Sequence, residues 1–164
     1  MFGKTTIIIL VVFLVAIALV LLWFYPPRPN IITPPEKPLI SVLSYGYVYD
    51  DKVWLEIHIS NGDKEGDRIV KIEVKYNGTT YVCSGIGVLP EGVNPVHKQL
   101  YPNDSYVYKG TEIPGLSKGW LHVSGCFPPG FMPKPGTGVE VILYFEKSGP
   151  CRHTTMFRQP EYSK

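Results

Sequence analysis

A run of 20 uncharged residues near the amino terminus, residues 5–24, most constrains what this chain can fold into. The segment reads TTIIILVVFLVAIALVLLWF and is apolar except for its two threonines. A helix of this length rises about 30 Å, which matches the hydrocarbon thickness of a bilayer. Pro26 and Pro27 follow at once, and proline does not continue a helix. The segment therefore predicts a transmembrane helix.

Two other interpretations of this segment are a cleaved signal peptide and a prepilin. Ala16-Ile17-Ala18 resembles a signal cleavage site, but the apolar run is longer than the roughly 7–15 residues of a signal peptide. Prepilin-type cleavage after Gly3 would leave an apolar helix for filament assembly, although Phe2 stands where such a site has a basic residue. Long domains that follow such a helix are translocated largely regardless of charge. We expect a retained single-pass anchor, with the amino terminus in the cytoplasm and the rest of the chain outside the cell.

Composition divides the chain into three parts. Residues 1–25 hold the tail and the predicted helix, and residues 26–38 hold six of the 16 prolines. This proline density favours an extended polyproline stalk. Residues 39–164 have the length and apolar content of one extracellular domain. The formal net charge of the chain is only +2, so we expect no nucleic-acid partner.

Alternating apolar and polar residues after position 39 indicate β-strands. The alternation is clear in residues 53–60, 70–76 and 139–145, and a period of two is typical of a strand with one buried face. Asn77-Gly78 between two such runs is a strong hairpin signal. We therefore predict an all-β domain, an immunoglobulin-like two-sheet sandwich of about eight strands, preceded by the membrane helix.

The three cysteines all follow the predicted helix, as expected for an oxidising compartment. If 120–125 and 139–146 are antiparallel, Cys126 and Cys151 fall at opposite ends of the sandwich, which makes them the least favoured pair. We therefore expect Cys83 to bond to one of the other two, with Cys126 favoured. Cys151 is then the odd cysteine.

Two N-glycosylation sequons begin at Asn77 and Asn103. Their use would agree with an extracellular domain. The first also lies in the predicted hairpin turn, which explains its sequence without a glycan.

The sequence carries no recognisable catalytic motif or phosphate-binding loop, and we expect a non-enzymatic protein without a cofactor. One metal site is the alternative. Cys151, His153 and Met156 lie together near the carboxyl terminus, and blue-copper domains use such ligands. The missing second histidine would be His97 or His122. This alternative is an anchored blue-copper electron carrier.

Glu56 and His58 lie on the same predicted outward face of one strand. They form half of a possible metal site, but the sequence does not identify the two further ligands. A solvated strand face is the favoured interpretation.

Aromatic residues on predicted outward faces and on one proline-rich loop indicate protein association, because exposed aromatic residues mark interfaces more often than catalytic sites. The candidates are Trp54, Trp120, Phe127, Phe131 and Tyr144. The expected partners are other cell-surface or envelope proteins or a second copy of the chain, with membrane lipid around residues 5–24.

The layout of one apolar helix, a stalk and a β-sandwich resembles archaeal pilin-like surface proteins. This group includes pilus subunits and the accessory proteins that connect the archaellum motor to the S-layer. The residues that carry the resemblance are TTIIILVVFLVAIALVLLWF, IVKIEVKYNGTTYV and GVEVILYFEKSG. The resemblance implies a structural surface protein that acts by association of its sandwich in a pilus, archaellum or S-layer assembly. The abundance of Tyr, Pro, Ile and Val suits a thermophile.

Overall fold

The computed structural model describes residues 3, 15–17, 39–103 and 106–161. The chain divides into two compact units, Met1–Glu36 and Lys37–Lys164. In the first unit residues 15–17 are helical, and the other residues of the predicted membrane helix and its stalk lie outside the described residues. Within the described part, no helix has the length and apolar character needed to cross a membrane.

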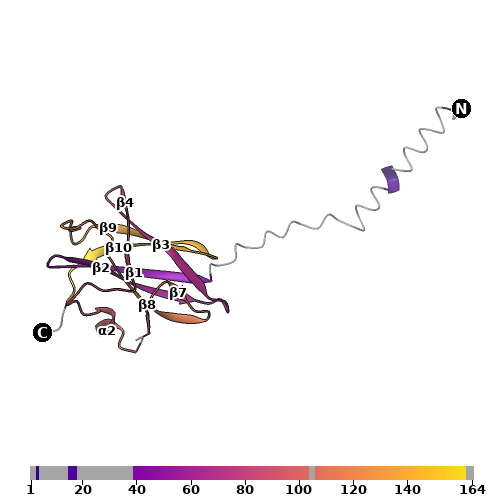
Figure 1. Cartoon of the computed structure of the whole chain (residues 1–164). Coiled ribbons are helices and arrows are strands. Elements are labelled where there is room, and N and C mark those ends of the chain that lie inside the picture. Colours follow the sequence, from indigo (N-terminus) through magenta and orange to yellow (C-terminus); the bar gives the residue numbers. More distant parts are fainter. Residues whose placement is uncertain (1–2, 4–14, 18–38, 104–105, 162–164) are drawn as a thin grey trace. The chain divides into compact units, whose positions relative to one another are not determined.

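The second unit is built mainly of strands, so the prediction of an all-β domain is confirmed (Figure 1). The long strands are β1 (Ile40–Tyr49), β2 (Lys52–Asn61), β3 (Asp67–Tyr76), β8 (Ser117–Ser124), β9 (Gly138–Phe145) and β10 (Gly149–Arg158). The short strands are β4 (Thr79–Val82), β5 (Gly85–Ile86), β6 (Val107–Tyr108) and β7 (Glu112–Ile113). One helical turn, α2 (His97–Leu100), lies between β5 and β6.

The strands form one hydrogen-bonded sheet rather than the two separate sheets that the sequence predicted. Its order is β4-β3-β9-β10-β1-β2-β8-β5, with β6 paired to β8 and β7 paired to β3. The two halves join where β1 and β10 run parallel, at Gly46 opposite Phe157 and Tyr47 opposite Arg158. Local alternation could not reveal this join, because its two strands lie at opposite ends of the domain sequence.

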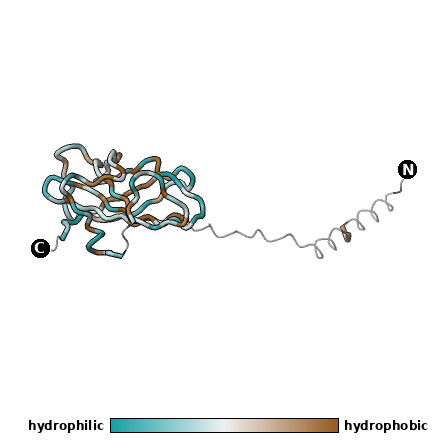
Figure 2. Tube along the Cα trace, turned by 60° about the horizontal axis from the view of Figure 1, so that its bottom comes forward, coloured by the Kyte–Doolittle hydropathy of each residue, from teal (hydrophilic) through white to brown (hydrophobic). Residues whose placement is uncertain are grey.

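The tight turns follow from residues that tolerate a left-handed backbone. Asn77 and Gly78 have φ angles of 48° and 79° between β3 and β4, as the hairpin signal predicted. Asp50, between β1 and β2, has a φ of 51°. Hydrophobic residues recur along the strands, and hydrophilic residues gather at the turns (Figure 2).

The core lies on the inner face of the sheet. Leu55, Ile57 and Ile59 of β2 are almost fully buried, as the alternation predicted. They pack in one cluster with Leu143 of β9 and Phe157 of β10. This cluster therefore connects both halves of the sheet.

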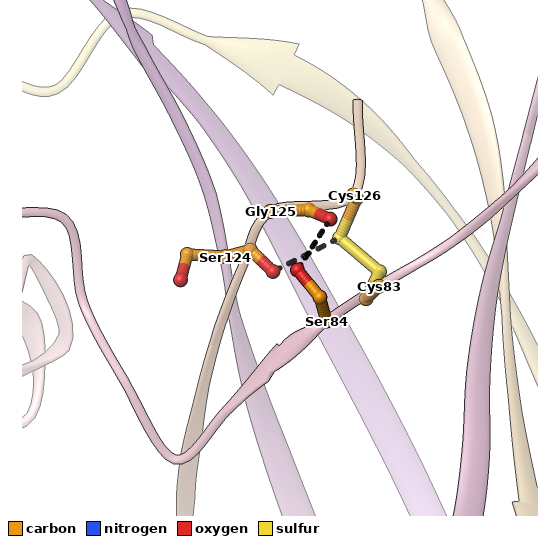
Figure 3. The surroundings of a disulfide bond; sticks show 5 residues. All are labelled: Cys83, Ser84, Ser124, Gly125 and Cys126. Atoms are coloured by element: carbon orange, nitrogen blue, oxygen red, sulfur yellow. Dashed lines mark hydrogen bonds between the residues drawn. A yellow bond between two sulfur atoms is a disulfide. The ribbon is translucent and has the colours of Figure 1, made fainter. Parts of the chain in front are cut away.

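A disulfide joins Cys83, just after β4, to Cys126, just after β8 (Figure 3). It is the pair that the sequence favoured, and Cys151 is the free cysteine of the described residues. Beside the bond the Ser84 hydroxyl donates to the carbonyl oxygen of Gly125 at 3.2 Å. Because β4 and β8 lie near opposite ends of the strand order, the sheet must curl to bring its two ends together.

Phe127 and Phe131 do not form an exposed interface loop, contrary to the sequence prediction. Both rings pack against the core, each with its centroid 5.9 Å from that of Tyr76. Tyr144 is half-buried, and its hydroxyl donates to Glu73 at 2.8 Å. Proline and glycine neighbours led us to place the two phenylalanines on a free loop, whereas that loop folds back over the core.

Candidate metal site

The site begins with the register between β2 and β8. Glu56 lies opposite His122, and Trp54 lies opposite Ser124. Directly opposed residues of an antiparallel pair have their side chains on the same face. The sheet therefore presents Trp54, Glu56, Trp120 and His122 together on the face that points away from the core.

This second face is covered as well, whereas the sequence predicted a solvated face at Glu56. We call residues 88–103 the covering segment. Its Leu89, Val93 and Val96 form an apolar cluster with Tyr47 and Trp54 of the sheet. As a result Trp54 is fully buried, and the predicted exposed interface at this residue is wrong.

Trp120, the second tryptophan predicted at an interface, is also covered. Only 3% of its surface is exposed. Its ring stacks on that of His97, with the centroids 4.7 Å apart, and on that of Tyr101 at 5.5 Å. Both of these rings belong to the covering segment, so this tryptophan forms an apolar wall of a buried site.

Glu56 is fully buried and accepts four hydrogen bonds. Its Oε1 accepts from the Trp54 indole nitrogen at 3.2 Å and from the Val96 backbone nitrogen at 2.7 Å. Its Oε2 accepts from the His97 backbone nitrogen at 2.7 Å and pairs with His97 Nδ1 at 2.8 Å. Burial raises the pKa of this carboxyl, but the hydrogen bonds outweigh it and leave the pKa below its usual value. The carboxylate is therefore ionised at neutral pH.

Two imidazoles face each other beside this carboxylate. His122 Nε2 lies 3.5 Å from His97 Nδ1. Burial lowers the pKa of His122 to about 4, against the opposing effect of the Glu56 charge, so this ring is neutral at pH 7. A neutral imidazole has a free lone pair, which is the form that binds metal ions.

The three groups have the spacing of a metal site. One ligand atom from each of Glu56, His97 and His122 lies within 4.8 Å of the other two. Tetrahedral ligands at about 2.0–2.1 Å from a metal lie about 3.3 Å apart. Two of the separations, 2.8 Å and 3.5 Å, lie on either side of that value. The third, between the Glu56 carboxylate and the His122 imidazole, lies within 4.8 Å, so these two side chains would have to approach each other to hold an ion.

Two buried nitrogens of this cluster have no hydrogen-bond partner within the described residues. They are His97 Nε2 and Trp120 Nε1. Glu56 holds His97 with a proton on Nδ1 in the metal-free state. A metal at Nδ1 requires that proton to move to Nε2, and no bonded group there opposes the move. The unpartnered nitrogen of His97 is thus compatible with both states.

The structure does not bring together the blue-copper ligands suggested by the sequence. Cys151, His153 and Met156 all lie on β10, and Met156 is 47% exposed. The Cys151 thiol contacts the Ile40 carbonyl oxygen at 3.8 Å. His153 Nδ1 accepts from the Ser44 backbone nitrogen at 3.0 Å. Cys151 and His153, two of the three suggested copper ligands, are therefore each engaged by a different residue of β1.

The sequence contains all three members of the observed cluster among its candidates, but in two different predicted sites. His97 and His122 belong to the predicted site around Cys151, and Glu56 to the one with His58. The separations along the chain explain this, because Glu56 and His97 are 41 residues apart. The available signal was the matching outward positions of Glu56 and His122 on two alternating strands.

No protein-family model and no curated protein sequence matches the chain. Solved structures that are similar to it include three PCuAC domains. The apo PmoF2 PCuAC domain is 16% identical, with a TM-score of 0.46 and coverage of 76% of this chain and 93% of that one. The apo PCuAC domain from PmoF1 is 14% identical, with a TM-score of 0.45 and coverage of 74% and 95%. The copper-bound PCuAC domain from PmoF2 is 13% identical, with a TM-score of 0.42 and coverage of 74% and 94%.

These findings overturn the resemblance inferred from the sequence. The similar structures are PCuAC domains and not archaeal pilin-like proteins, so the predicted pilin-like membership was wrong. The structural role in a pilus, archaellum or S-layer assembly, which followed from it, is corrected with it. An apolar helix, a proline-rich segment and alternating strands describe a layout that many unrelated proteins share.

Proposed function

We propose that residues 39–161 form a metal-binding domain that holds one divalent transition-metal ion, copper(II) in the first place, between Glu56, His97 and His122. The observation that carries this proposal is the convergence of one ionised carboxylate and two imidazoles in a buried site. A purely structural role would account for the Glu56–His97 pair. It would not account for the buried imidazole of His122, whose Nε2 is directed at the same His97 Nδ1 that pairs with Glu56.

Copper(II) is the first candidate because of the ligand chemistry. Two imidazoles and a carboxylate suit divalent ions of the later first-row metals, and copper(II) binds most tightly to such sites. The cluster has no thiolate or thioether, the ligands that copper(I) prefers. One of the similar domains is described as copper-bound, whereas for this chain copper follows from its own three side chains.

We also propose that the domain works outside the cytoplasm, held by a single-pass anchor. The Cys83–Cys126 disulfide supports an oxidising compartment, and the length of the apolar segment 5–24 supports an uncleaved anchor. Mass spectrometry of the mature protein should find residues 5–24. A mature amino terminus near Leu39 would contradict the anchor.

Titration of the purified full-length chain with copper(II) tests the metal site. Calorimetry should give one ion per chain, and electron paramagnetic resonance should show nitrogen coupling from two imidazoles. His97→Gln and His122→Gln should each weaken binding by at least about 100-fold, since even the loss of an outer contact costs 10–100-fold. His153→Gln is the matched control outside the cluster. Unchanged copper binding in both cluster variants would refute this ligand set.

A further inference from the structure

We propose that the covering segment is a clasp: it opens to admit the ion and closes to supply the third ligand, so that its opening sets the rate of metal uptake and release. This inference rests on the proposed function and describes how the same site is loaded. It follows from where the three ligands lie and from how the covering segment is held.

Two ligands lie on the sheet and one lies on the covering segment. Glu56 and His122 are directly paired within an eight-residue antiparallel register between β2 and β8. His97 is the first residue of α2, within the covering segment. An open covering segment would therefore leave a two-ligand site on the sheet, and closure would complete it.

The covering segment has no strand pairing with the sheet. Its backbone-to-backbone hydrogen bonds, as far as the described residues show, run within the segment, for example from Tyr101 to His97 at 2.7 Å. Apolar contacts of Val93 and Val96 hold it to the sheet. The Glu56 carboxylate adds hydrogen bonds from two backbone nitrogens. A segment held only by side chains opens at a lower free-energy cost than a strand in the ladder.

The ion has no direct access to the closed site. The exposed fractions of Glu56, His97 and His122 are 0%, 1% and 7%. Side chains with so little exposed surface leave no path for a hydrated ion to reach them, so the covering segment has to move first. Glu56 connects this motion to the chemistry, because the same carboxylate holds the segment backbone and offers Oε2 to the metal.

Val93→Ala tests the clasp without touching a ligand. The truncated side chain should weaken docking equally in the metal-free and metal-bound closed states, because Val93 packs against Tyr47, Trp54 and Val96 and is not itself a ligand. Uptake and release should therefore both accelerate by about fourfold, because the half-buried Val93 side chain loses the equivalent of about one buried methylene group. The affinity and the stoichiometry should stay unchanged. Val70→Ala, on an exposed position of β3, is the matched control.

The measurement is stopped-flow mixing of the full-length chain with copper(II), followed by quenching of the fluorescence of Trp54 and Trp120. The uptake rate should level off at high copper concentration, where opening becomes limiting. Hydrogen exchange in residues 88–103 should slow when copper is bound. Normal binding with equal uptake rates in Val93→Ala and wild type would overturn the clasp and leave the proposed function intact. No copper binding by the wild type in the equilibrium titration would overturn both.

Discussion

Replacing Glu56 by glutamine should strongly destabilise the metal-free domain, although the two side chains have almost the same shape. The carboxylate accepts four hydrogen bonds, two on each oxygen. Glutamine keeps one oxygen, which can still accept from Trp54 and Val96. Its amide group would instead face the backbone N–H of His97, a donor against a donor.

The magnitude follows from the bonds that are lost. A hydrogen bond to an ionised acceptor contributes about 1.5–3 kcal/mol. If His97 changes tautomer and accepts from the new amide, one charged bond is lost, and if it does not, two are lost. We therefore expect a loss of about 2–5 kcal/mol from a total stability of roughly 5–15 kcal/mol. The hydrogen bonds that lower the pKa of Glu56 stabilise the folded state fully above its unfolded-state pKa of about 4.3. That contribution is lost as the pH falls through the lower folded-state value.

Guanidinium unfolding of the metal-free chain, followed by tryptophan fluorescence, measures this loss at pH 7. Glu140→Gln is the matched control, because Glu140 forms partly exposed ion pairs with Lys75 and Arg152. Such pairs contribute about 0–1 kcal/mol. A Glu56→Gln protein within 1 kcal/mol of the wild type would refute the role of this carboxylate as the clamp of the covering segment.

Three further outcomes follow from the structure. Burial lowers the pKa of His122 from 6.5 to about 4 in the folded state, so protonation favours the unfolded state as the pH falls below 6.5. The free energy of unfolding of the metal-free chain should therefore fall by up to about 3 kcal/mol between pH 6.5 and 4, and this fall should be absent in His122→Gln. Asp67→Asn should cost about 2–3 kcal/mol in thermal unfolding, because Asp67 accepts from the backbone nitrogen and the hydroxyl of Ser148 at 2.9 and 2.7 Å. Joint replacement of Phe127 and Phe131 by serine should lower the free energy of unfolding by at least about 3 kcal/mol, seen as a lower denaturation midpoint, whereas two exposed rings would leave the midpoint unchanged.

Much of the local structure of the domain can be predicted from its sequence. The alternation around Leu55 and Ile57 assigned the inward face of β2 correctly, since a strand places every second side chain on the same side. Asn77-Gly78 predicted its hairpin because few residues adopt the backbone that this turn requires. Strand direction argued only against a Cys126–Cys151 bond, and the favoured Cys83–Cys126 bond is the one observed.

The outward face was the point at which sequence reasoning failed. Alternation shows that Trp54 and Glu56 point away from the core, but not whether another segment covers them. The covering segment has no apolar period of its own, because it docks through single residues such as Val96 and His97. Contacts between residues that are 25 (His97 and His122), 41 (Glu56 and His97) and 66 (Glu56 and His122) positions apart assemble the site, and no local pattern encodes them.

In the proposed metal site, His97 is the one ligand that lies on a segment outside the strand ladder. The register of β2 and β8 fixes the distance between Glu56 and His122, so these two donors cannot change place without disturbing the sheet. The third donor carries no such restraint. His97→Cys would offer a soft thiolate and His97→Asp a hard carboxylate from the same place. Preference among metals could therefore diverge, in evolution or by engineering, through one short loop while the folding unit stays the same.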